Sequence, residues 1–274
     1  MQRLRLAAAL GWGFPTWQED DEAALLGAFG IRHVQVFRNR ELAIDPAELR
    51  RRLADAGIEA TSFHAAFGRD LEPSNPDEPS RRHCVEGLAR EMDFCLGLGG
   101  SAIVIHPGEG NLGDQTRDAK RLAALAASAR ELADLAAERK LVAAMENLQP
   151  GQMGDDMVAL RSIVDEVNSP HLGINYDCGH ANLTADPLTV LRQAGPRIVS
   201  THIHDNHGAQ DEHLAPGFGT IDMDAVCRGL AAVGYRGEFV LELMETTEAL
   251  RRKCDAVWVE KLNRWIDLAS GIIP

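Results

Sequence analysis

The chain has 274 residues, of which 45% are hydrophobic and 25% are charged, and this composition is that of a globular protein. Its formal charge of −13 disfavours a strongly basic nucleic-acid-binding surface, although a local basic loop on an acidic protein can still bind DNA. The five cysteines are scattered and form no CxxC pair, which argues against a disulfide framework and a thiolate zinc site and favours the reducing cytoplasm.

Short apolar segments, rich in β-branched residues or bounded by glycine, recur along the chain and indicate β-strands. The first lies in MQRLRLAAALGWGF, which we interpret as a strand and not as a signal peptide, because Gly and Trp interrupt its apolar run. No apolar stretch reaches 18 residues, so we expect no association with a membrane. The predicted strands cover residues 4–11, 33–37, 58–64, 102–106, 141–146, 172–177, 198–204 and 239–243.

Longer segments with helical periodicity alternate with these strands. Asp45 before Pro46, and Asp186 before Pro187, are typical of an N-cap residue followed by proline at the first helical position. Glycines such as Gly57 stand where helices should end. The predicted helices cover residues 19–29, 46–56, 79–98, 115–139, 154–167, 186–194, 222–233 and 247–268.

This alternation predicts the α/β class, with parallel strands whose two faces are covered. Eight repeats in a chain of this length favour closure into a single (β/α)8 TIM barrel over an open, doubly wound sheet. The open sheet is further disfavoured because neither GxGxxG nor GxxxxGK[ST] follows any predicted strand. Without a linker or a shift in composition, we expect one domain over residues 1–274.

Imidazole and carboxylate groups gather at the carboxyl ends of the predicted strands and in the loops that follow. These ends meet at one mouth of a barrel, so the groups are expected to converge there. Burying so many polar groups without partners would be costly, whereas a divalent cation compensates them by coordination. The candidate residues are His64, His106, Glu146, Asp177, His180, His202, His204, Asp211, His213 and Glu242.

Each of these groups has a structural alternative. Glu146 and Glu242 follow apolar runs that tolerate a carboxylate poorly, which favours ligands or catalysts. Asp177 and His180 could instead stabilise a turn, although the company of ionisable groups on neighbouring strands argues against it. The remaining histidines lack matched partners and are expected to be ordinary hydrogen-bonded residues: His33, His83, His171 and His207.

The sequence motifs at the ends of the predicted strands resemble those of the xylose isomerase-like barrel superfamily. This superfamily contains sugar and sugar-phosphate isomerases and epimerases together with endonuclease IV, and the resemblance covers nearly the whole chain. Each motif alone is weak, but their order is specific. The motifs are FHAAF (63–67), IHPGEG (105–110), MEN (145–147), DCGH (177–180), HIHD (202–205), DEHLAPGFGTID (211–222) and LEL (241–243).

The resemblance implies one divalent ion, Mn, Mg, Co or Zn, bound by four residues at the ends of the fifth to eighth strands. Such an ion would polarise a carbonyl, while two glutamates would move a proton through an enediolate as general base and acid. His202 is preferred to His204 because Asp205 follows it by three residues, as in family members. The implied ligands are Glu146, Asp177, His202 and Glu242, with Glu146 and Glu242 also catalytic.

The implied substrate is a carbohydrate: a sugar, a sugar phosphate or a related polyol or keto compound. His180 is similar to a family position that contacts substrate hydroxyls. Trp12 and Phe14 could offer an apolar face to the substrate. Arg69 and Arg117 are the nearest candidates for binding a phosphate group on it. Gly217 and Gly219 are expected to form the flexible backbone of a lid over the site, while substrate identity and oligomeric state are left open.

An endonuclease IV-like phosphodiesterase is the main alternative. The metal ligands that endonuclease IV has in addition to these four also have counterparts in this sequence. Two or three zinc ions would then hydrolyse a phosphodiester. The loops after His64 and His106 are poor in basic residues, which disfavours a nucleic-acid partner. A non-catalytic metal-binding barrel is a third alternative, disfavoured because both glutamates are retained. The counterparts of the further ligands are His64, His106, His180, Asp211 and His213, with His204 able to contact substrate or a second metal.

Overall fold

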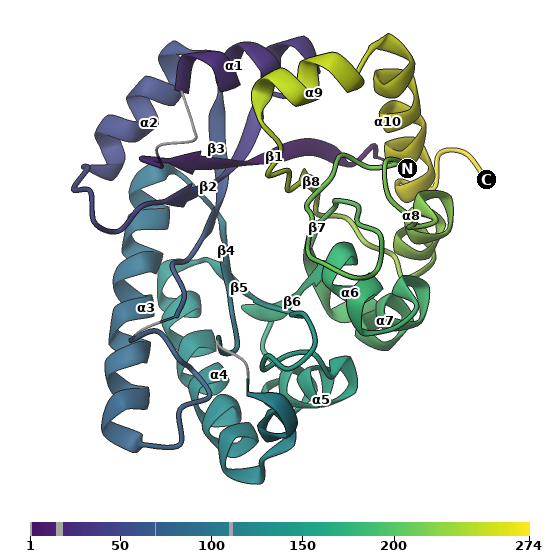
Figure 1. Cartoon of the computed structure of the whole chain (residues 1–274). Coiled ribbons are helices and arrows are strands. Elements are labelled where there is room, and N and C mark those ends of the chain that lie inside the picture. Colours follow the sequence, from purple (N-terminus) through teal and green to yellow (C-terminus); the bar gives the residue numbers. More distant parts are fainter. Residues whose placement is uncertain (1, 15–18, 69, 110–111) are drawn as a thin grey trace.

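The structure is a computed structural model that describes residues 2–14, 19–68, 70–109 and 112–274 (Figure 1). Within this part of the chain, eight strands form one sheet in which every paired neighbour runs parallel. The strands are β1 (Arg5–Trp12), β2 (His33–Arg38), β3 (Glu59–His64), β4 (Ala102–Ile105), β5 (Val142–Glu146), β6 (Leu172–Asp177), β7 (Ile198–His202) and β8 (Glu238–Leu241).

The sheet has the order β7-β6-β5-β4-β3-β2-β1-β8 and curls until its two edge strands meet. Just beyond the end of β7, the Ile203 backbone N–H donates to the carbonyl of Val240 at 2.8 Å, and the Glu242 N–H donates to the carbonyl of Ile203 at 3.3 Å. The sheet is therefore a nearly closed barrel. The predicted (β/α)8 barrel is confirmed, and the open-sheet alternative is wrong.

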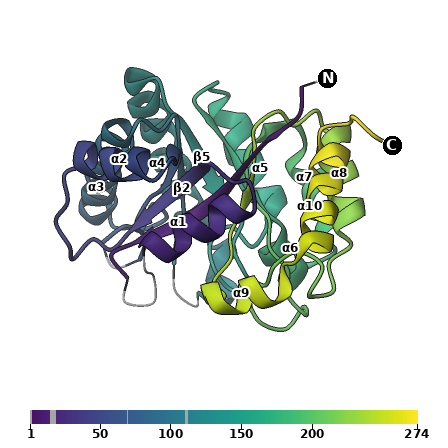
Figure 2. The same cartoon turned by 90° about the horizontal axis from the view of Figure 1, so that it is seen from above.

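Helices connect the strands and lie around the outside of the sheet, as the two views in Figures 1 and 2 show. None of the described helices is both long and apolar enough to cross a membrane. The helices are α1 (Glu19–Ala28), α2 (Pro46–Asp55), α3 (Glu78–Leu98), α4 (Ala119–Arg139), α5 (Met157–Val167), α6 (Cys178–Thr184), α7 (Pro187–Ala194), α8 (Met223–Ala232), α9 (Thr247–Lys253) and α10 (Ala256–Ala269), with short 3₁₀ helices η1 (Gly113–Arg117) and η2 (Gly195–Arg197).

The two predicted aspartate caps are confirmed. The Asp45 carboxylate accepts hydrogen bonds from the backbone N–H groups of Ala47 and Glu48 at the start of α2. Asp186 accepts a bond from the N–H of Thr189 at 2.8 Å, at the start of α7. These bonds satisfy amide groups that have no partner within the helix.

The predicted helix 247–268 is wrong, because two helices, α9 and α10, occupy this segment. They are separated at Cys254 and Asp255, where Asp255 has extended backbone angles and caps α10 by accepting from the Trp258 N–H at 3.0 Å. A side chain that competes for backbone amides ends one helix and begins the next. The hydrophobic periodicity continues through this break and so did not reveal it.

Other element boundaries also differ from the sequence prediction. Strand β7 ends at His202 rather than at residue 204, and the predicted helix 115–139 is split into η1 and α4 by the cap residue Asp118. The short helix α6 was not predicted. It begins directly after Asp177, whose carboxylate accepts from the His180 N–H at 2.7 Å, so the turn expected as the structural alternative is a helix start.

We expect Trp258 to be the main contact that holds α10 on the barrel. Its side chain is buried, its ring packs at 5.2 Å from that of Phe29, and its indole N–H donates to the Pro216 carbonyl at 2.9 Å. Trp258→Ala should lower the free energy of unfolding by about 3–5 kcal/mol, and Trp258→Phe by about 1–2 kcal/mol. Urea unfolding measures both; equal losses would contradict a separate contribution from the hydrogen bond.

Candidate metal centre at the mouth of the barrel

The carboxyl ends of four adjacent strands bring together the four residues expected to bind one cation. Glu146, Asp177 and His202 are the last residues of β5, β6 and β7, and Glu242 directly follows β8. Each offers one nitrogen or oxygen atom, and these four atoms lie within 4.8 Å of one another. Residues nearly a hundred positions apart thus meet because parallel strands end at the same rim.

One imidazole nitrogen lies at the centre of this group. His202 Nδ1 is 2.7 Å from Glu146 Oε1, 3.2 Å from Glu242 Oε2 and 3.5 Å from Asp177 Oδ2. On the other side of the ring, His202 Nε2 lies 2.7 Å from Gln35 Oε1. Donation from Nε2 to this amide oxygen would leave Nδ1 free to bind a cation placed among the carboxylates.

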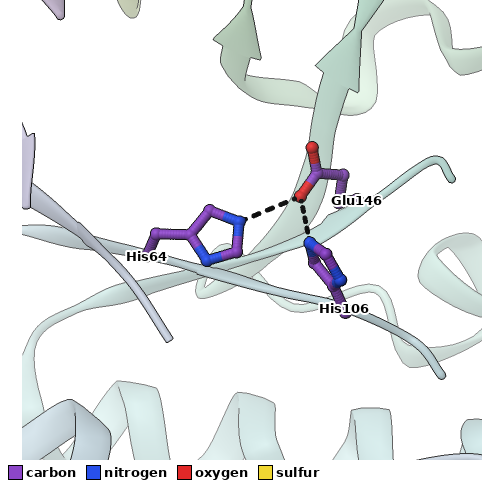
Figure 3. Close-up of side chains that lie close together, drawn as sticks. All are labelled: His64, His106 and Glu146. Atoms are coloured by element: carbon purple, nitrogen blue, oxygen red, sulfur yellow. Dashed lines mark ion pairs between the residues drawn. The ribbon is translucent and has the colours of Figure 1, made fainter. Parts of the chain in front are cut away.

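A second group surrounds the other oxygen of Glu146 (Figure 3). His64 and His106 point toward Glu146 Oε2, with Nε2–oxygen distances of 3.3 and 3.0 Å. This oxygen is buried, yet it has no partner in hydrogen-bonding geometry within the described part of the chain. Two imidazoles and an unsatisfied carboxylate oxygen are a set that a cation would complete.

A third group lies on the opposite side of the mouth. Asp211 Oδ2 is 3.0 Å from His180 Nε2 and 3.0 Å from His213 Nε2. The other oxygen of Asp211 is buried and has no hydrogen-bond partner among the described residues. The structure therefore also brings together the three residues His180, Asp211 and His213 as a potential metal-binding group.

Hydrogen bonds from the far side orient the rings of these outer groups. His64 Nδ1 lies 2.8 Å from the carbonyl of Ala65, and His106 Nδ1 contacts a carboxylate oxygen of Glu109. His180 Nδ1 lies 2.9 Å from the Asn147 carbonyl. Donation from each Nδ1 turns the Nε2 atom toward the shared carboxylates, as is common for ligating histidines.

His204 occupies a separate position beside Asp177. Its Nε2 lies 3.0 Å from Asp177 Oδ1, and its ring stacks on that of His213 at 4.0 Å with an interplanar angle of 11°. Its Nδ1 is buried and has no partner in the described structure. His202, and not His204, belongs to the four-residue group, although His204 also lies near Glu242 and His213.

Burial favours the neutral forms of the central residues, whereas their neighbouring charges favour the charged forms. Burial alone would raise the pKa of Glu146, but the neighbouring His202 charge lowers it well below its usual range. For Glu242, burial is outweighed by His202, and the pKa falls to about 2. The pKa of His202 is raised well above its usual value, because Glu146 and Glu242 outweigh its burial. In the metal-free protein, protons on imidazoles thus supply the positive charge that these carboxylates need.

The sequence profile of the Xylose isomerase-like TIM barrel family matches residues 7–265. The chain belongs to this family. A relative, the uncharacterized protein MJ1311 of Methanocaldococcus jannaschii, is 30% identical over 200 residues, which cover 69% of this chain and 66% of that protein. The chain thus spans slightly less than two thirds of the length of MJ1311.

Two further relatives carry names that describe an epimerase. L-ribulose-5-phosphate 3-epimerase UlaE of Salmonella paratyphi A is 23% identical over 267 residues, covering 97% of this chain and 88% of that protein. The crystal structure of a D-tagatose 3-epimerase-like protein matches with a TM-score of 0.78 at 22% identity, covering 99% of this chain and 100% of that one. At this identity the structural likeness establishes the fold.

In this xylose isomerase-like barrel, the loop after β7 packs on a buried carboxylate. Asp205 accepts hydrogen bonds from the backbone N–H groups of Gly217 at 2.9 Å and Ile221 at 3.1 Å. A Cβ atom at Gly219 would lie 2.3 Å from Asp205 Oδ1. Gly219 therefore allows this loop to pack closely on Asp205, and the flexibility expected at Gly217 and Gly219 stays a prediction.

The residues expected to contact the substrate do not all lie beside the candidate metal centre. Phe14 stacks on Phe37 near the mouth, whereas Trp12 borders a different hollow, beside α2. Arg117 is exposed and pairs with Asp156 at 3.2 Å, and Arg69 lies outside the described residues. The four histidines expected to be structural belong to none of the clusters found in the described residues: His33, His83, His171 and His207.

Sequence reasoning missed two residues that orient ligands. Gln35 is fully buried in β2 and supports His202, and Glu109 contacts His106. Each left a signal: Gln35 is the one polar side chain inside the apolar run of HVQVF, and Glu109 follows His106 by one helical turn's spacing in IHPGEG. A buried amide in a strand requires a partner, and here that partner is His202.

Gly179 is expected to be required because His204 lies against its backbone. A Cβ atom at this position would be 1.9 Å from His204 Cε1, although the helical backbone itself would accept alanine. Gly179→Ala should therefore destabilise the protein by about 1–3 kcal/mol through overpacking. A double-mutant cycle with His204→Ala measures the cause: the loss should shrink when the ring is absent, and an unchanged loss would contradict the steric explanation.

The stability of the metal-free protein should fall as the pH rises above about 6.5. Burial alone would lower the pKa of His180, but mainly Asp177 and then Asp211 raise it to about 10. A raised pKa stabilises fully below the unfolded-state value, and this contribution is lost as the pH rises through the folded-state value. Conversely, the Glu242 pKa of about 2 stabilises at pH values above its unfolded-state pKa and is lost toward pH 2.

Thermal unfolding in the presence of a chelator, across this pH range, measures the effect. The maximum melting temperature is expected between about pH 4.5 and 6.5. A maximum above about pH 8 would contradict the proposed protonation of the histidines.

Proposed function

We propose that this protein is a divalent-metal-dependent isomerase or epimerase that acts on a sugar or a related hydroxy-carbonyl compound. The observation that carries the proposal is the convergence of three carboxylates on one imidazole nitrogen at the barrel mouth. The names of UlaE and of the D-tagatose 3-epimerase-like protein support this reaction class.

The residues present fit a divalent cation. Three carboxylates and one imidazole form a donor set suited to Mn, Mg, Co or Zn, and in the described part of the chain the partner that these three carboxylates share is an imidazole nitrogen rather than a permanent cation. When bound, such a cation would act as a Lewis acid on a carbonyl oxygen and a neighbouring hydroxyl. Glu146, Asp177, His202 and Glu242 would hold it.

The two glutamates would move the proton. Glu242 borders the cavity next to the centre and is ionised at neutral pH, so its carboxylate can accept a proton from a carbon beside the carbonyl. Glu146 comes from β5 and would pass to the enediolate a proton that it receives from His106, whose Nε2 lies 3.0 Å from Glu146 Oε2 and whose pKa is raised to about 9 by Glu109 and Glu146 despite its burial. Return to the opposite face epimerises the carbon, and return to the neighbouring carbon isomerises the substrate.

A multinuclear zinc phosphodiesterase is the second candidate, favoured by the two further ligand groups. In this case Glu146 would help to hold a second ion together with His64 and His106, and His180, Asp211 and His213 would hold a third. Binding DNA there would require basic side chains around the mouth. The cavity beside Glu242 has no lysine or arginine among its described lining residues, which supports the isomerase reaction instead.

Metal content and a single substitution test the proposal. We expect about one equivalent of bound metal per chain, and Glu242→Gln should lower turnover of a ketose panel by about 10²–10⁴-fold while the protein stays folded. Glu238→Gln is the matched control, because it makes the same change at the other end of β8 and should leave turnover nearly intact.

Other results would redirect the assignment. Two or three equivalents of zinc, with nicking of abasic-site DNA that depends on His64 and His106, would establish the phosphodiesterase instead. Bound metal without either activity would favour a non-catalytic metal-binding barrel.

A further inference from the structure

A cavity of about 430 Å³ adjoins the candidate metal centre on the side of β1 and β8. Three residues of the centre or its support, Gln35, His64 and Glu242, form part of its wall. Helices α1 and α9, which lie side by side in Figures 1 and 2, close its outer side. The cavity is thus continuous with the carboxylate that we propose as the proton acceptor.

Most of the wall is apolar. Near the centre, Phe37 stacks between Phe14 at 5.1 Å and Phe67 at 5.6 Å, with interplanar angles of 13° and 6°. Phe67 in turn stacks on His106 at 4.2 Å, so this row of rings reaches the metal centre. Farther away, aliphatic side chains from β1, α1, β8 and α9 continue the wall: Leu10, Leu25, Leu26, Leu241, Leu243 and Leu250.

Small residues of β1 leave the space open. Ala8, Ala9 and Gly11 line the cavity, and each has a methyl group or a hydrogen where larger aliphatic residues would fill the gap. Interiors of proteins are normally close-packed, so a void of this size beside a site calls for an occupant.

The charges on this wall exclude an anionic occupant. Among the described residues that line the cavity there is no lysine or arginine, while two are acidic, Glu242 and Glu245. Glu245 is already satisfied by Lys253 and by the Ala215 N–H, which it accepts at 2.9 Å. A phosphate placed here would lose water without gaining a cationic partner.

We infer that the substrate carries an apolar, uncharged substituent of several carbon atoms next to its hydroxy-carbonyl group, and that this cavity holds the substituent. The inference rests on the proposed function, because the metal centre would hold the reacting end. It narrows the substrate class from sugars and sugar phosphates in general to unphosphorylated compounds with an apolar tail.

A chain-length series of hydroxyketones tests the inference on the manganese-loaded protein. Calorimetry with hydroxyacetone, 1-hydroxy-2-hexanone and 1-hydroxy-2-octanone should show affinity that rises by up to about fourfold per added methylene group. Dihydroxyacetone phosphate should bind no more tightly than dihydroxyacetone. Equal affinities along the series, or tighter binding of the phosphate, would overturn the inference.

A pair of substitutions in α1 tests whether the apolar substituent binds in this cavity. Leu25 is buried and lines the cavity, whereas its neighbour Ala24 is exposed. Leu25→Trp should abolish the preference for the longer chains while the protein still binds metal, and Ala24→Trp should behave as the unmodified protein. If Leu25→Trp keeps the chain-length preference, the assignment of this cavity is wrong.

Exchange of the α-hydrogen of hydroxyacetone in D₂O separates this inference from the proposed function. Exchange that depends on Glu242, without any effect of chain length, would contradict the cavity assignment alone. An effect of chain length that persists in chelator-treated protein, with no exchange under any condition, would support the cavity and contradict the proposed isomerase or epimerase.

Discussion

The structure of the barrel mouth depends on one electrostatic constraint: three carboxylates approach a single imidazole nitrogen in a buried site. Glu146, Asp177 and Glu242 would repel one another if no positive charge lay between them. In the metal-free protein that charge is a proton on His202, with further protonated histidines around it. A divalent cation bound at the same point would replace those protons, which makes metal binding and protonation competing processes.

The fold meets this constraint with ordinary elements. Glu146, Asp177 and His202 end their strands and Glu242 directly follows β8, so the barrel holds the backbone of each in place. Contacts from Gln35 and Glu109 orient the rings of His202 and His106. The buried carboxylate of Asp205 organises the following loop by accepting backbone N–H groups. The site is therefore supported by residues that do not themselves belong to the ligand groups.

The mouth combines two very different environments. One side is crowded with imidazoles and carboxylates, and the other is an apolar cavity walled by stacked phenylalanines and leucines. Glu242 belongs to both, since its carboxylate faces His202 while it borders the cavity. Such an arrangement suits a molecule with one polar end and an apolar remainder.

The sequence by itself determined the alternation of strands and helices, the barrel, and the residues that gather at its mouth. It could do so because hydrophobic periodicity and cap residues such as Asp45 act over a few neighbouring positions. The division of one long predicted helix at Asp255, and the start of α6 at Asp177, escaped this reasoning because a local side-chain bond overrode the periodicity.

Only the tertiary structure decided which of the predicted residues lie together in each cluster at the barrel mouth. It placed His202 in the central group and His204 beside Asp177, identified Gln35 as a support, and showed that the loop after β7 packs on Asp205. These distinctions depend on which atoms of distant strands come within about 3 Å of each other. No pattern of neighbouring residues contains that information, because barrel closure sets the distances between strands that are far apart in the chain.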